Sequence, residues 1–176
     1  MSVSFVAAGA IAANATVTSQ AITAPVTAAD DILLAFVFNR DATANTISAP
    51  DGSWTQVIQD TNTEVAGHQY AVFWRTATGS GGDFTFTKAT DDNVVFGGVI
   101  AAWRGQNLTT PIDATTPVAT EGTVSEDNVN FPAFDPTSTD VEATFAAFYP
   151  QDLTTFAAAM SNDVNPDCTI RFDEET

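Results

Sequence analysis

Four oxygen-bearing side chains near the C-terminus have the spacing of a calcium-binding loop. Asp163, Asn165, Asp167 and Glu174 occupy positions 1, 3, 5 and 12 of an EF-hand-like loop. Cys168 stands where such a loop needs a glycine, and no flanking helix is expected. A chain with 22 acidic residues offers this spacing by composition alone, so solvated loop acids are the expected role. Calcium binding is the alternative, and no metal or cofactor site is predicted.

Nucleophilic catalysis needs a base beside a serine, threonine or cysteine. The single histidine, His68, has no nucleophile-elbow sequence near it, and we expect it at the start of a strand on the surface. The single cysteine, Cys168, lies in an alternating stretch and is expected to be a small buried hydrophobe. Carboxylate pairs for glycoside hydrolysis carry no specificity in so acidic a chain. No catalytic residue is predicted, and the chain is not expected to be an enzyme.

The charge of the chain restricts its partners. Its 176 residues carry 22 acidic and five basic side chains, for a net charge of −17. Such a surface repels phosphate, so neither nucleic acid nor an anionic membrane is an expected partner. No apolar run approaches the ~20 residues that span a bilayer, so membrane insertion is not expected.

The same charge points to a salty environment. Self-repulsion destabilises a compact domain unless salt screens it, and the screening length falls from ~8 Å at 0.15 M to ~3 Å at 1 M. The sequence has one lysine, and its acids are spread along the whole length. We therefore expect a halophilic archaeon or its virus as the source, with an ordinary acidic extracellular or marine phage protein as the alternative.

Apolar residues recur with a period of two, which predicts strands. The continuous run 32–38 predicts a strand buried on both faces, and Gly97-Gly98 inside the run 94–103 predicts a bulge or a close backbone approach. Val3 and Phe5 alternate with serines, which favours an N-terminal strand over a signal peptide. Further alternation is found at 70–75, 84–87, 141–149 and 168–172.

About nine or ten short strands with Gly, Pro and Asp turns between them predict an all-β fold. The expected architecture is a two-sheet antiparallel sandwich, jelly-roll-like, forming one domain over residues 1–176. Residues 105–136 are polar and contain four prolines, so long connections or edge strands are expected there. Leu153 to Met160 is ambiguous because alanines interrupt its pattern.

The order of motifs from Asp30 to Ala114 resembles a sandwich module of tailed-virus virion proteins and some bacterial surface proteins. The motifs are DILLAFVF at 31–38, GSWTQV at 52–57, VFWR at 72–75, FTFT at 84–87, AWRG at 102–105 and PIDA at 111–114. The resemblance covers about half of the chain. It implies a jelly-roll-like fold and a non-enzymatic surface or appendage role, with final strands that are shortened, and it transfers no catalytic residue.

The motif tryptophans and arginines have structural roles that follow from their types. Trp54, Trp74 and Trp103 are expected to fill the gap between two sheets ~10 Å apart. Arg75 and Arg104 each follow a tryptophan directly. We expect each arginine to pair with a loop carboxylate such as Asp91 or Asp113, with a sugar- or partner-binding pair as the alternative.

These features together predict a structural virion protein, a capsid decoration, turret or tail-appendage subunit. Its partners would be other virion proteins, copies of itself in a trimer or pentamer, and a glycan or protein of the host surface. The alternative is a carbohydrate-binding or adhesion module at a cell surface. Sugar stacking would then fall to Phe148, Tyr149 or His68, because the tryptophans are expected inside.

Overall fold

The computed structural model describes residues 3–40, 45–60, 68–90 and 95–112. This part of the chain contains strands and no helix, and so no helix that could cross a membrane. The strands are β1 (Ser4–Ala8), β2 (Ala12–Asn14), β3 (Ser19–Thr23), β4 (Ala29–Arg40), β5 (Ile47–Ser48), β6 (Thr55–Asp60), β7 (His68–Thr78), β8 (Asp83–Lys88) and β9 (Phe96–Arg104).

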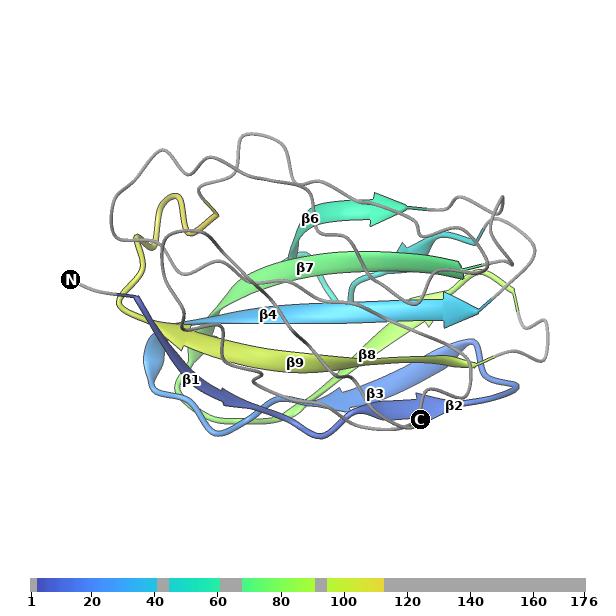
Figure 1. Ribbon diagram of the computed structural model, residues 1–176, viewed down its shortest axis with the longest axis horizontal. Helices are drawn as coiled ribbons and strands as arrows, with labels where there is room; N and C mark the ends of the chain where they lie inside the picture. The colour runs from blue at the N-terminus through green and yellow to red at the C-terminus, as the bar shows by residue number, and fades with distance from the viewer. Residues whose placement is uncertain (1–2, 41–44, 61–67, 91–94, 113–176) are drawn as a thin grey trace, which may run out of the picture.

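The strands form two antiparallel sheets (Figure 1). The larger sheet has the order β1-β9-β4-β7-β6, with β2 also paired to β9, and the smaller sheet has the order β3-β8-β5. The pairs are nested, because β1 pairs with β9, β3 with β8 and β4 with β7. One long hairpin rolled into two layers produces this nesting, so the predicted jelly-roll-like sandwich is confirmed.

The core between the sheets is built from side chains that alternate along facing strands. Phe86 of β8 contacts Phe73 of β7, with ring centroids 5.7 Å apart. Trp54 packs edge-on against Phe84 and Phe86 at 5.1 and 5.4 Å. Offset and edge-to-face contacts of this kind add stability beyond the area they bury. This aromatic cluster holds β8, the central strand of the small sheet, against the large sheet.

The strand β4 is buried on both faces, as its apolar run predicts. Leu33 and Val37 belong to the core between the sheets, whereas Phe36 belongs to a separate apolar cluster. That second cluster also contains Val99 and Trp103 of β9. The large sheet therefore has an apolar layer on the side that faces away from the small sheet.

The expectation that all three tryptophans lie between the sheets is wrong for two of them. Only Trp54 belongs to the core between the sheets. Trp103 belongs to the second cluster, and Trp74 lies directly opposite Leu34, which packs against that same cluster. Residues opposite one another on antiparallel strands share a face, so strand register decides the side of Trp74 and of Trp103.

The prediction of a close backbone approach at Gly97-Gly98 is confirmed. The strand β9 continues past β4 without a register shift at this point, so there is no bulge. A side chain on Gly98 would overlap the carbonyl oxygen of Phe36 and come within 2.8 Å of Ile22 Cδ1. A side chain on Gly97 would lie 2.7 Å from Ala13 Cα. The glycines let β2, β3 and β4 crowd around one end of β9.

Several predictions fall outside the described residues. They are the strands at 141–149 and 168–172, the ambiguous stretch 153–160, and the calcium-like spacing of Asp163, Asn165, Asp167 and Glu174. That residues 1–176 form a single domain stays a prediction, because it includes residues outside the described ranges. The N-terminal strand is confirmed, since β1 begins at Ser4.

Candidate functional site

A backbone irregularity at the start of β4 creates a carboxylate site. The register between β4 and β7 shifts between Ala29 and Ile32, and Asp30 has a φ of 70°. Positive φ is tolerated by aspartate better than by most residues. Ile32 pairs with Trp103 of β9, so the preceding residue, Asp31, lies beside Arg104 at the end of β9. Pairing of β4 with β9 thus joins two residues that are distant in sequence.

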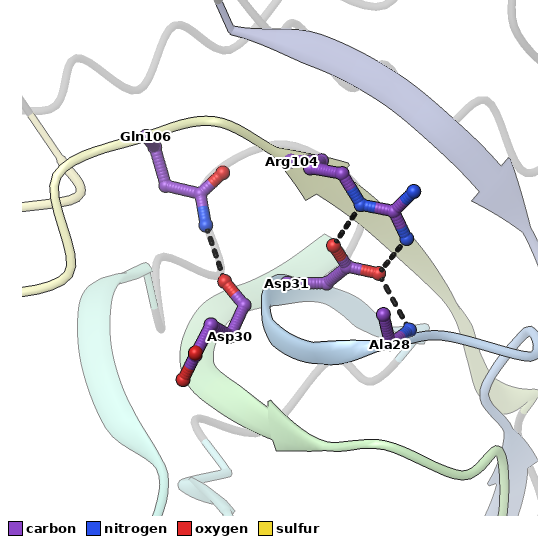
Figure 2. Close-up of polar contacts among 5 residues, drawn as sticks. All are labelled: Ala28, Asp30, Asp31, Arg104 and Gln106. Atoms are coloured by element: carbon purple, nitrogen blue, oxygen red, sulfur yellow. Dashed lines mark hydrogen bonds and ion pairs between the residues drawn. The ribbon is translucent and has the colours of Figure 1, made fainter. Parts of the chain in front are cut away.

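Asp31 and Arg104 form a two-pronged ion pair (Figure 2). Arg104 Nε donates to Oδ1 of Asp31 at 2.6 Å, and Nη2 donates to Oδ2 at 2.7 Å. The backbone N–H of Ala28 donates to Oδ2 at 2.8 Å. Paired N–H groups of a guanidinium match a carboxylate in both charge and geometry. The ion pair connects the start of β4 to the end of β9.

The two partners differ strongly in exposure. The side chain of Asp31 is 1% exposed and that of Arg104 is 55% exposed. The hydrogen bonds from Arg104 hold the pKa of Asp31 below its usual value, against the opposing effect of burial, and the Ala28 N–H adds to the lowering. The same pair raises the pKa of Arg104. Asp31 is therefore ionised and held in place, which suits a structural clamp.

The loop after β9 is tied to the same irregularity. Gln106 Nε2 donates to the backbone carbonyl of Asp30 at 3.0 Å (Figure 2). Asn107 Oδ1 then accepts from the N–H of Thr109 at 2.8 Å and forms a short turn. The polar groups at this end of the sandwich thus connect strands and loops of the framework.

Arg75 packs over aromatic rings, whereas Arg104 pairs with a carboxylate. Its guanidinium carbon lies 5.6 Å from the ring centre of Trp54 and 5.0 Å from that of Phe84. Its Nε donates to the carbonyl of Thr76 at 3.3 Å. Within the described residues this guanidinium covers the aromatic cluster at the sheet edge and forms no ion pair.

The expected arginine–carboxylate pairing is therefore confirmed in kind for Arg104 only. Its partner is Asp31 at a strand start, whereas a loop acid such as Asp91 or Asp113 was expected; both of those acids lie outside the described residues. For Arg75 the described contacts are two aromatic rings and the backbone carbonyl of Thr76.

A second polar cluster lies inside the opposite end of β4. Lys88, the single lysine, is 5% exposed at the end of β8. Its Nζ donates to Asn39 Oδ1 at 3.1 Å and lies 5.8 Å from the ring centre of Phe96. The Asn39 amide in turn donates to Gln69 Oε1 at 3.4 Å. The lysine thus connects β8 of the small sheet to β4 and β7 of the large sheet.

Asn45 extends this cluster to the segment before β5. Its backbone N–H donates to Gln69 Oε1 at 2.9 Å. Its side-chain Oδ1 accepts from the N–H of Ala89 at 2.9 Å, and its Nδ2 donates to Thr90 Oγ1 at 2.7 Å. This network is not predicted from the sequence. The available signal was Asn39 and Gln69, which continue the inward alternation of Val37 and Ala71 with amides.

The described residues offer little for catalysis or sugar stacking. They contain no group of three His, Cys, Asp or Glu side chains that could hold a metal ion. His68 is the first residue of β7, as expected for a strand start. The large exposed apolar side chains of this part are Val26 and Leu108, neither of which is aromatic. Phe148 and Tyr149 lie outside the described residues.

Comparisons with protein-family models, with curated proteins and with solved structures find no match for this chain.

Proposed function

We propose that this chain is a structural virion protein, a capsid decoration, turret or tail-appendage subunit of a virus with a halophilic host. The observation that supports the proposal is that buried polar side chains connect strands of the sandwich to one another. Asp31 and Lys88 lie at opposite ends of β4, and each connects strands that are distant in sequence. Such groups resist deformation of the sandwich, which suits a rigid building block of a particle.

Two further features support a role on a particle. Nested sandwiches leave their loops at the two ends, where they can contact neighbours or a host surface. A net charge of −17 keeps separate copies soluble, and concentrated salt shortens the range of their repulsion enough to permit packing. We propose a closed trimer or pentamer of this chain, with further contacts to other virion proteins.

Particles of the virus that encodes the chain provide the direct test. Quantitative mass spectrometry of density-purified particles should find the chain in a fixed ratio to the major capsid protein. Electron cryomicroscopy should then place a two-layer β-density at symmetry-related positions. Particles that lack the chain after high-salt purification would refute the virion role.

The oligomeric state gives an independent check on the purified protein. Light scattering coupled to gel filtration in 2 M NaCl should report a mass about three or five times 18.5 kDa. A single-chain mass across protein concentrations in that buffer would exclude the self-assembled subunit. The Asp31→Asn variant serves as a control, because the ion pair lies inside one chain and its loss should leave the oligomeric mass unchanged.

A further inference from the structure

Two asparagines of the chain lie in the sequence pattern that N-linked glycosylation requires. The pattern is asparagine, any residue except proline, and then serine or threonine. It occurs at 14–16, as Asn-Ala-Thr, and at 107–109, as Asn-Leu-Thr. So short a pattern also arises by chance in a sequence rich in threonine. The surroundings of each asparagine therefore decide whether it can accept a sugar.

Asn14 is part of the strand framework. It is the last residue of β2 and pairs with Phe96 of β9. Its side chain lies at the surface, but its Nδ2 donates to Oε1 of Gln20 at 2.6 Å, and Gln20 is 7% exposed. The nitrogen that would carry a sugar is thus used inside the fold. A transferase reaches this asparagine only after β2 opens.

Asn107 lies in a different setting, in the loop that follows β9. Asn107, Leu108 and Thr109 are all exposed. Oδ1 of Asn107 accepts from the N–H of Thr109 at 2.8 Å and from the N–H of Thr110 at 3.3 Å. Within the described part of the chain these are the hydrogen bonds of this side chain, so Nδ2 is left without a partner. The reacting nitrogen and the hydroxyl of Thr109 are therefore both accessible on one turn.

The loop is fixed at its base. Gln106 Nε2 donates to the carbonyl of Asp30 at 3.0 Å, and Arg104 forms its ion pair with Asp31 two residues earlier (Figure 2). The turn at Asn107 therefore projects from the end of the sandwich at a defined place. An enzyme can bind it there without unfolding a strand.

We propose that Asn107 is an acceptor site for an N-linked glycan. The donor is a lipid-linked oligosaccharide, and an oligosaccharyltransferase catalyses the transfer. Nδ2 of Asn107 attacks the anomeric carbon of the first sugar and forms the new C–N bond. The bond from that carbon to the phosphate oxygen of the lipid carrier breaks, and the oxygen keeps the electron pair. The transferase removes the amide proton.

The position of the site has two consequences. Chains that carry this modification leave the cytoplasm, so a glycan at Asn107 implies export of the chain. A glycan is also bulky and hydrophilic, so the end of the sandwich that carries Asn107 should face solvent. That this end faces away from neighbouring copies rests on the proposed function, whereas the glycan itself suits a cell-surface module equally well.

Transfer to the folded chain in vitro tests the choice between the two asparagines. The assay combines the full-length chain in its native salt, a lipid-linked oligosaccharide of known mass, and a transferase that modifies two control peptides, residues 11–17 and 104–110. The intact chain should gain the mass of one oligosaccharide, which fragment masses should place on Asn107. The initial rate at Asn107 should exceed that at Asn14 by about tenfold or more, because transfer to Asn14 has to wait for opening of β2.

Matched variants separate the acceptor chemistry from the structure of the loop. Asn107→Gln and Thr109→Ala should abolish the transfer, and the second keeps the backbone N–H that bonds to Oδ1. Thr109→Ser restores a hydroxyl and should keep the transfer, as should Asn14→Gln. Transfer mainly to Asn14, or no transfer to Asn107 in the chain, would overturn the proposal.

The mass of the chain from its natural source provides the final check. Intact-mass spectrometry should find it heavier than the 18.5 kDa of the sequence, with the added mass on the peptide that contains Asn107. A peptide without added mass would refute the modification. That result would leave the virion role untouched, since the presence of the chain in purified particles is measured separately.

Discussion

The carboxylate of Asp31 receives three donors from two parts of the chain that are far apart in sequence. Arg104 supplies two of them and the Ala28 backbone supplies the third. Because the carboxylate is 1% exposed, water cannot replace a lost donor. The ion pair is therefore a structural contact whose removal should be measurable.

Asp31→Asn should lower the free energy of unfolding by about 1 to 3 kcal/mol, because a neutral amide cannot accept the paired guanidinium donors as a carboxylate does. Urea denaturation measures the loss. Asp30→Asn is the matched control, since this neighbouring side chain is exposed and asparagine tolerates the φ of 70°. Equal stability of Asp31→Asn and the parent chain would refute a stabilising role for the pair.

The ion pair between Asp31 and Arg104 should also make the free energy of unfolding depend on pH. The folded-state pKa of Asp31 is lowered, chiefly by the hydrogen bonds from Arg104. The pair therefore stabilises fully above the unfolded-state pKa, near 4, and its contribution disappears as the pH falls through the lower folded-state pKa. Urea unfolding from pH 6 to pH 3 should show a steeper loss for the parent than for Asp31→Asn. Parallel curves would contradict the assignment.

Asn45 is the centre of the second polar cluster. Asn45→Ala should lower the free energy of unfolding by about 2 to 4 kcal/mol, because the N–H of Ala89 and the hydroxyl of Thr90 lose a hydrogen-bond partner. Thermal unfolding followed by circular dichroism measures this. Asn107→Ala, in an exposed turn, is the control and should change stability by less than about 0.5 kcal/mol. Similar losses of stability for the two substitutions would show that the hydrogen bonds of Asn45 do not stabilise the fold.

At the scale of elements, β9 is a strand of the large sheet that is paired on both sides. It pairs with β1, β2 and β4, and it is buried along its length up to Arg104 (Figure 1). Such a central strand tolerates neither an added side chain nor a shift in register.

Gly98→Ala should destabilise the chain by about 1 to 3 kcal/mol, because the new methyl group would overlap the Phe36 carbonyl and crowd Ile22. Gly52→Ala is the control, since nothing lies within 4 Å of a Cβ at that turn. Differential scanning calorimetry of the two variants gives the comparison. An unchanged unfolding temperature for Gly98→Ala would mean that β4 and β9 are less tightly apposed than described.

Local pattern predicted the longer strands of the described chain, whereas β2 and β3 were not predicted. Alternation predicted the strands around Phe36 and Phe86, and a glycine pair inside an apolar run predicted the close approach on β9. Long-range pairing was beyond reach, since Asp31 and Arg104 are brought together only by the register of β4 on β9. Trp54, just before β6, and Trp103 on β9 belong to different apolar clusters, and no local pattern distinguishes them.

At the scale of the whole molecule, the two polar clusters and the two apolar layers act against a large net charge. The described strands hold the sheets together through contacts of short range, whereas repulsion among 22 acidic side chains acts over the full surface. Salt weakens only the second effect, because exposed charges are screened and buried pairs are not.

Raising NaCl from 0.05 M to 1 M should therefore raise the unfolding temperature, on the order of 10 °C for a domain of this size. Further NaCl above about 1 M should raise the unfolding temperature little, because the screening length is already down to ~3 Å there. Sucrose is the control, because it stabilises by exclusion from the protein surface without screening charge, and its effect should not reach a plateau. An unfolding temperature independent of NaCl over this range would show that surface repulsion does not limit stability. The physical basis for assigning the chain to a salty environment would then be lost.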